Sequence, residues 1–171
     1  MLVLIGVSFL SVSYANAKTD QEFYSNGNTC YEQGNFKQAI SDYTKAIEID
    51  PNYGEAYCGR GFAYERQNNL PQAISDFTKA IEITSNYAEA YYGRGVVYYD
   101  QRNLPQAISD FTKAIAIYPD FDEAYNNRGL AYYTAKEYDL AWADMHKAES
   151  LGFKIDPNYI EELKKASGRE K

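Results

Sequence analysis

The sequence has very few of the side chains that most often carry out chemistry. Its 171 residues include one His, one Trp and two Cys, against 18 Tyr. His146 has neither a second His nor a Cys-x-x-Cys pair near it, so we expect no metal site. No nucleophile elbow, glycine-rich phosphate loop or paired-acid motif occurs. These absences argue against an enzyme and lead us to expect no cofactor.

Positive charge is also scarce. Lys and Arg number 17 against 24 Asp and Glu, which gives a net charge of −7 at pH 7. Such a field repels phosphate backbones and anionic membrane surfaces, so nucleic acid is a poor candidate partner. The chain length and the 45% hydrophobic content suffice for one domain with a buried core.

Long apolar runs are missing apart from a short one over residues 2–10. It is followed by Ala15-Asn16-Ala17, a small-x-small site, so the sequence predicts a cleaved signal peptide over residues 1–17 and export to the periplasm or the medium. The run is shorter than the roughly 20 residues that span a bilayer, which disfavours a retained anchor or any stable membrane span. No Lys or Arg precedes it, which leaves open a start codon further upstream or a frayed apolar helix in a cytosolic protein.

The sequence is rich in internal repetition. Three sets of small residues each recur every 34 residues: Gly27, Gly61, Gly95 and Gly129; Ala39, Ala73, Ala107 and Ala141; and Ala46, Ala80, Ala114 and Ala148. The string Gln-Ala-Ile-Ser-Asp-Tyr/Phe-Thr-Lys-Ala-Ile also recurs, at 38–47, 72–81 and 106–115. A fixed period of this length is typical of stacked helical units.

Each unit has the pattern of a helical hairpin. In the second unit, residues 57–64 keep the three- and four-residue spacing of one helical face. Asn69-Leu70-Pro71 then offers an N-cap and a first-turn proline for a second helix. The small residues Gly61 and Ala73 let the two helices approach closely, while Phe77 fills the space around them.

The hairpins end at Pro51, Ser85 or Pro119, each followed two residues later by an aromatic residue, so the repeats span 20–53, 54–87, 88–121 and 122–155. In the fourth repeat the corresponding proline, Pro157, arrives four residues late, which indicates a longer second helix or a longer exit loop. The amphipathic segment 157–167, which ends at Gly168, predicts a capping helix over the last apolar face, and we expect the chain to be complete there.

Over residues 20–155 these features resemble the tetratricopeptide repeat (TPR). The resemblance implies an all-α domain over 18–171: a right-handed α-solenoid of four TPR hairpins plus a C-terminal capping helix. In that family the first helices line a concave groove that contacts peptides. The corresponding positions of this chain are Tyr24, Asn28, Tyr31, Glu55, Cys58, Phe62, Glu65, Glu89, Tyr92, Val96, Tyr99, Asp100, Glu123, Asn126, Asn127, Leu130 and Tyr133.

The expected groove is aromatic and acidic. Chaperone-binding members of the family clamp a C-terminal carboxylate with Lys, Arg and Asn at such positions, and here only Asn28 fits, so a heat-shock co-chaperone role is disfavoured. A basic protein or peptide segment with apolar side chains is the favoured partner. The alternative is that the tyrosines merely cover their neighbours.

The resemblance therefore favours a protein-binding scaffold in an envelope or secreted assembly. An accessory or inhibitory subunit of an enzyme complex, or an unrecognised enzyme, is the alternative. The sequence does not determine an oligomeric state.

Opposite charges also recur in step with the repeats. Arg60, Arg94 and Arg128 precede Asp76, Asp110 and Asp144 by sixteen residues, one on each helix of a hairpin. This spacing predicts structural salt bridges, within or between repeats, and a ligand site is the alternative. The first repeat has Asp42 but carries Asn26 in place of the Arg.

The two cysteines fall on the first helices of neighbouring repeats. Cys30 and Cys58 lie about a turn and a half apart along those helices, which exceeds the ~4.4–6.8 Å Cα separation of a disulfide. We therefore expect two free thiols that pack as small apolar groups.

Overall fold

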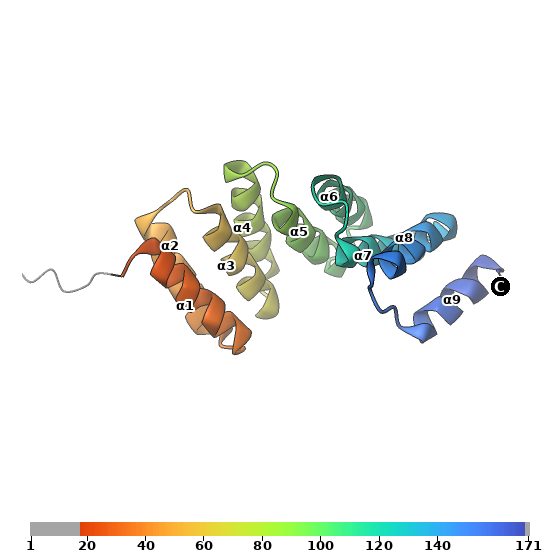
Figure 1. The fold of residues 1–171 in the computed structure, drawn as a ribbon, viewed down its shortest axis with the longest axis horizontal. Coiled ribbons are helices and arrows are strands. Elements are labelled where there is room, and N and C mark those ends of the chain that lie inside the picture. The colour runs from red at the N-terminus through yellow and green to blue at the C-terminus, as the bar shows by residue number, and fades with distance from the viewer. Residues whose placement is uncertain (1–17, 170–171) are drawn as a thin grey trace, which may run out of the picture.

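The computed structural model describes residues 18–169, which form a row of helices with no strand among them (Figure 1). In order, the helices are α1 (Asp20–Glu32), α2 (Phe36–Ile49), α3 (Gly54–Arg66), α4 (Leu70–Ile83), α5 (Ala88–Asp100), α6 (Leu104–Ile117), α7 (Asp122–Thr134), α8 (Tyr138–Leu151) and α9 (Pro157–Ser167). The all-α repeat fold predicted from the sequence is confirmed. The predicted signal peptide lies outside the described residues.

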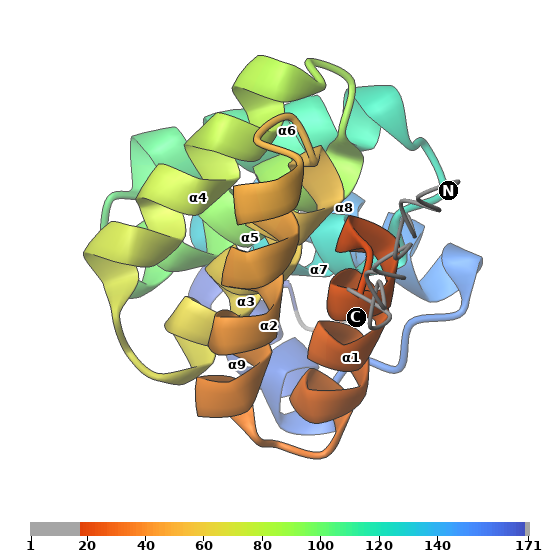
Figure 2. The same ribbon diagram turned by 90° about the vertical axis from the view of Figure 1, so that its left-hand side faces the viewer.

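Consecutive helices pair as hairpins: α1 with α2, α3 with α4, α5 with α6, and α7 with α8. Each odd-numbered helix also contacts the next odd-numbered one, from α1 to α7. Figure 2 turns the N-terminal hairpin toward the viewer and shows the later hairpins stacked behind it around a common axis. The stack is therefore a solenoid in which the first helices of successive hairpins are neighbours. No helix within 18–169 has the length and apolar character needed to cross a membrane.

Glycines let one aromatic ring fill the space between two hairpins. The ring of Phe77 on α4 is completely buried. A Cβ on Gly61 of the same hairpin would lie 2.9 Å from this ring, and a Cβ on Gly93 of the next hairpin would lie 2.5 Å from it. Tyr43 has the same relation to Gly59 in the next hairpin, at 2.7 Å. The 34-residue glycine comb therefore marks hairpin closure, and the second pair of glycines marks hairpin stacking.

The second helices begin where predicted, but two of the predicted caps are wrong. Asn35 caps α2 with its side chain, which accepts a hydrogen bond from the backbone N–H three residues later. Asn69 and Asn103 occupy the N-cap positions of α4 and α6 but make no such bond. Pro71 and Pro105 follow at the second helical position and remove one of the two backbone donors that an N-cap side chain can use.

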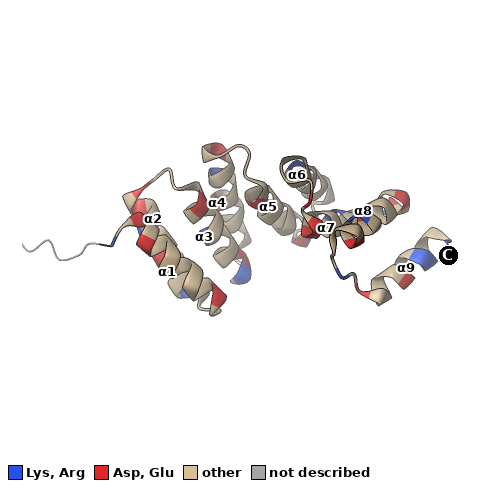
Figure 3. Cartoon of the chain, in the orientation of Figure 1, with Lys and Arg blue, Asp and Glu red and all other residues tan. Residues whose placement is uncertain are grey.

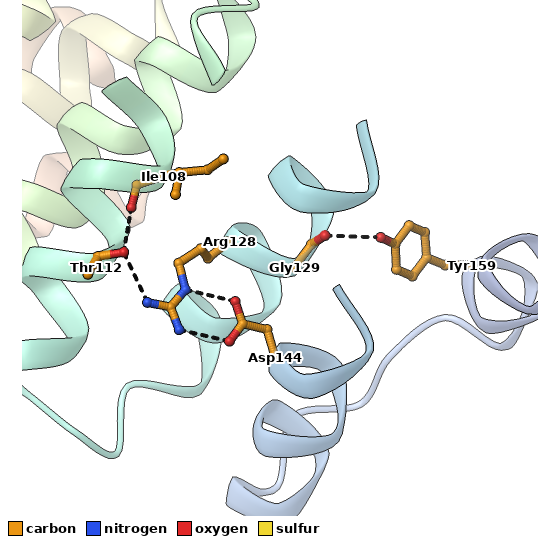
Figure 4. Close-up of polar contacts among 6 residues, drawn as sticks. All are labelled: Ile108, Thr112, Arg128, Gly129, Asp144 and Tyr159. Carbon is orange, nitrogen blue, oxygen red and sulfur yellow. Dashed lines mark hydrogen bonds and ion pairs between the residues drawn. The ribbon is translucent and has the colours of Figure 1, made fainter. Parts of the chain in front are cut away.

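Three Arg–Asp pairs join the helices within hairpins and also tie neighbouring hairpins together. In Figure 4, Arg128 donates from Nε and Nη2 to the two carboxylate oxygens of Asp144, at 2.7 and 2.8 Å. Its Nη1 donates to Oγ1 of Thr112 in the preceding repeat, at 3.0 Å, and Thr112 donates to the carbonyl of Ile108. Arg60 and Arg94 repeat this arrangement. The predicted salt bridges are confirmed, and the threonine is an inter-repeat partner that the sequence did not indicate.

The late proline of the fourth repeat reflects its exit loop. Helix α8 has 14 residues, as α2, α4 and α6 have, and it ends at Gly152, whose φ is +106°. The longer loop brings α9 beside α8, where Leu163 is fully buried against Trp142 and Met145. The Trp142 indole N–H donates to Oγ of Ser167 at 3.1 Å. Helix α9 thus covers the end of the apolar core.

Candidate protein-binding groove

The sequence-predicted contact residues all lie on the first helices α1, α3, α5 and α7, and hydrogen bonds between hairpins connect them. The Asn127 amide donates to the hydroxyl of Tyr92 at 2.9 Å, and the hydroxyl of Tyr99 lies 3.3 Å from Oγ1 of Thr134. Because each first helix contacts the next, these positions form one continuous strip, which we call the groove. Among them, Cys58 is only 2% exposed and contributes little surface.

Tyrosines of the groove pack in pairs with aromatic residues at the ends of the repeats. The ring centroids of Tyr24 and Tyr53 are 5.0 Å apart, and those of Tyr92 and Phe121 are 4.9 Å apart. Tyr24 and Tyr92 are nevertheless only half-buried, so they cover their neighbours and still present part of each ring to the groove. Burial raises the pKa of Tyr92 to about 12, so its phenol stays neutral at physiological pH.

Exposed carboxylates recur along the groove. Glu55, Glu89 and Glu123 lie in the first turns of α3, α5 and α7, and in the described part of the chain none of them belongs to an ion pair. Figure 3 shows these acidic positions in red on the first helices. A carboxylate in a first turn also interacts favourably with the positive end of the helix dipole. The same three residues therefore stabilise their helices and set a negative potential along the groove.

Two further acids lie near the middle of the groove. Burial raises the pKa of Glu65, and nearby Asp100 raises it further, while Arg66 lowers it. The pKa of Asp100 is also raised by burial. Within the four first helices, Arg66 is the sole basic residue outside the Arg–Asp pairs, and its guanidinium lies over the ring of Phe36, 5.5 Å from the centroid. The negative charge of Glu65 and Asp100 is thus poorly compensated.

Helix α9 closes the C-terminal end of the groove. The ring of Tyr159 packs edge-on against Tyr133, with centroids 5.2 Å apart, and Leu130 packs against the same cluster. The hydroxyl of Tyr159 donates to the backbone carbonyl of Gly129 at 3.4 Å (Figure 4). The structure therefore places Leu130 and Tyr133 partly under α9, and the more open stretch of the groove runs from Tyr24 to Asn127.

A hollow of ≈ 210 Å³ opens on the groove where α1, α3 and α5 meet. Besides predicted contact residues, it is lined by Tyr43, Gly59 and Tyr87, which sequence reasoning missed. One sequence signal points to it: Cys58 stands where Tyr24 and Tyr92 stand in the adjacent repeats.

Neither cysteine forms a disulfide, as expected from the repeat register. Cys58 is buried and Cys30 is half-buried. Burial raises the pKa of the Cys58 thiol to about 12, so it stays protonated and is a poor nucleophile. His146 is exposed, with its ring centroid 5.4 Å from that of Trp142, and residues 18–169 contain no cluster of side chains that could hold a metal ion.

The fold and the groove define a helical-repeat protein with a ligand-binding surface on its first helices. Comparison with family models gives the family. The model described as TPR repeat matches residues 27–68 and 66–102, and the model described as Tetratricopeptide repeat matches 88–121. Together these matches cover more than half of the 171 residues, so the chain belongs to the tetratricopeptide-repeat family.

Solved structures agree. A crystal structure of MamA is 31% identical over 77% of each chain, with a TM-score of 0.72. The first TPR of Spaghetti (RPAP3), bound to the HSP90 peptide SRMEEVD, is 26% identical over 68% of this chain and 93% of its own, with a TM-score of 0.67. The Arabidopsis OM64 TPR domain is 25% identical over 68% of this chain and 96% of its own, with a TM-score of 0.67. A comparison with curated protein sequences finds no match.

Proposed function

We propose that this chain is a protein–protein interaction module that holds a segment of a partner protein in its groove. The observation that carries the proposal is the continuous strip on α1, α3, α5 and α7, where half-exposed tyrosines alternate with unpaired carboxylates. Tyrosine supplies a rigid apolar face with a polar tip, a combination enriched at the energetic centres of interfaces. Peptide binding by the related Spaghetti domain supports this use of the fold.

The charge of the groove favours a partner segment that carries Lys or Arg beside apolar side chains. Carboxylates recurring at the same place in α3, α5 and α7 add their potentials along one line. The HSP90 peptide SRMEEVD has three acidic residues and one Arg, and the acidic groove here would repel it. Asn28, the one residue that fits a carboxylate clamp, already accepts a hydrogen bond from the hydroxyl of Tyr43 at 2.7 Å.

We place this function in an envelope or secreted assembly. That part of the proposal rests on the sequence pattern of residues 1–17. An accessory or inhibitory subunit of an enzyme complex would use the same groove, and the experiment below would also identify its partner. We propose no catalytic role, because the groove offers neutral phenols and exposed carboxylates without a paired nucleophile and base.

The test begins with capture of the partner by the full chain from its native extract and identification by mass spectrometry. The partner is then titrated calorimetrically against wild type, Tyr99→Ala and Glu89→Lys at low and at high salt. Glu48→Lys, at an exposed position on the second helix α2, is the charge-matched control. We expect both groove variants to bind about tenfold more weakly or worse, and the control to bind as wild type does. If both groove variants bind as tightly as wild type, the groove is not the site.

A further inference from the structure

The hollow on the groove has an apolar interior. Its volume is ≈ 210 Å³, and its floor contains Tyr43 and Cys58, each only 2% exposed. Tyr24, Phe62 and Tyr87 form its sides. Sites for drug-sized molecules typically measure about 300–1,000 Å³, so this hollow is sized for a single side chain.

The hollow exists because one ring is missing from a regular row. Tyr24 packs on Tyr53, and Tyr92 packs on Phe121, at centroid distances of 5.0 and 4.9 Å. Cys58 holds the equivalent position between them, 34 residues from each tyrosine. A thiol occupies much less space than a phenol ring, and the space left open is the hollow.

Charge at the hollow has one sign. Glu55 and Glu89 line it, both side chains are exposed, and no Lys or Arg is among its lining residues. Neither carboxylate is engaged in an ion pair with any residue from 18 to 169. Burial raises the pKa values of Tyr43 and Tyr87 well above the ordinary range, so these phenols add no compensating or competing charge at neutral pH.

We propose that this hollow is the anchor pocket for one Lys or Arg side chain of the partner. The apolar stem of that side chain lies along Phe62 and Tyr87, and its cationic head lies between Glu55 and Glu89. Aromatic faces attract such a head, and its methylene groups bury apolar area without burying the charge. This assignment rests on the proposed function, because the partner that brings the side chain is the one bound in the groove.

The direct test uses three capped peptides that differ at one position: Ac-Gly-Leu-Lys-Leu-Gly-NH₂ and its counterparts with Arg or norleucine at the centre. Each is titrated into the ¹⁵N-labelled full chain and followed by NMR. We expect the Lys and Arg peptides to shift the amide signals of Cys58 and Gly59, with a Kd at least tenfold lower than that of the norleucine peptide. Equal binding of the norleucine peptide, or no shift with Lys and Arg at millimolar concentration, would overturn the assignment.

Two variants remove the pocket by different routes. Cys58→Tyr restores the ring that the adjacent repeats have and fills the hollow without a change of charge. Glu55→Gln combined with Glu89→Gln keeps the shape and removes the charge. Each should weaken the Lys peptide at least tenfold, whereas Glu123→Gln, at the same repeat position on α7 but outside the hollow, should change its Kd less than twofold. Circular dichroism verifies folding, and if Cys58→Tyr does not fold, the double glutamine variant decides.

The anchor and the groove can fail separately. If the captured partner binds Cys58→Tyr as tightly as wild type but loses affinity for Tyr99→Ala, the anchor assignment is wrong and the groove function stands. If the partner binds Tyr99→Ala and Glu89→Lys normally, the groove function itself is wrong. Shifts at Cys58 and Gly59 that appear on raising the concentration of the chain alone would assign the hollow to a second copy and would also overturn the proposal.

Discussion

The ring of Phe77 lies against Gly93 so closely that a Cβ on that glycine would be 2.5 Å from ring carbons Cε1 and Cζ. The ring is also bounded by Gly61 on the other side and is fully buried, so it cannot swing away. We therefore predict that Gly93→Ala destabilises the protein by about 1–3 kcal/mol through overpacking, measured by urea unfolding. Gly54→Ala is the matched control, because a Cβ there meets its nearest atom at 3.4 Å. Equal stability of the two variants would contradict this account of hairpin stacking.

Ala107 tests the closure of a single hairpin. It is completely buried on α6 and belongs to one of the 34-residue combs of small residues. Ala107→Leu should force α5 and α6 apart and cost about 1–3 kcal/mol or more, with protection from hydrogen exchange lost in both neighbouring hairpins. Ala116→Leu, at an exposed position of the same helix, should leave the melting temperature nearly unchanged. An unchanged melting temperature for Ala107→Leu would show that the register is wrong.

The Arg94–Asp110 pair should be costly to break and cheap to remove. The Asp110 side chain is only 8% exposed, so Arg94→Met leaves a buried carboxylate without its partner, at a cost of about 3 kcal/mol. Replacing both residues, with Asp110→Leu added, removes the uncompensated charge and should recover most of that loss. Thermal unfolding of the two single variants and the double variant measures the coupling directly. Additive losses would mean that the two side chains act independently.

Glu65 should reduce stability while it serves binding. Its pKa is raised in the folded state, so the folded chain binds more protons than the unfolded one as pH rises above about 4.5. Stability therefore falls as pH rises through the window between the unfolded and the folded pKa. We predict that Glu65→Gln raises the melting temperature at pH 7 and has less effect at pH 4.

The same substitution should weaken a cationic partner, because it removes negative charge from the middle of the groove. Glu48→Gln, at an exposed position on α2, should show neither effect. If Glu65→Gln lowers stability at pH 7, the carboxylate is part of a favourable interaction and the prediction is wrong.

The repeat pattern predicted the fold because each conserved spacing within the chain corresponds to one physical contact. The glycine and alanine combs mark helix crossings, and the Arg–Asp spacing marks a hydrogen-bonded pair that the structure contains. Thr78 was not identified as a partner of Arg94, because a threonine on a helix surface has no pattern that distinguishes it from a solvated one. The cover of Tyr133 by α9 follows from a loop that breaks the 34-residue period, and periodicity gives no information beyond that break.

The hollow was harder to predict than the groove. Its sequence signal is a deficiency, Cys58 in place of a ring, and the consequence depends on which side chains surround the space. Tyr43 and Tyr87 line it from a second helix and from a turn, which is information that the position of Cys58 alone does not carry.

The bond from each arginine to the threonine of the preceding repeat has a consequence for the evolution and engineering of the molecule. Arg60 meets Thr44, Arg94 meets Thr78 and Arg128 meets Thr112, so each interface presents the same donor and the same acceptor. A duplicated copy of residues 88–121 inserted after Phe121 would find Thr112 for its arginine and would offer its own threonine to Arg128. Groove length is thus set by the number of copies of one interchangeable unit, and unequal recombination would lengthen the binding surface in steps of one hairpin without a new interface having to arise.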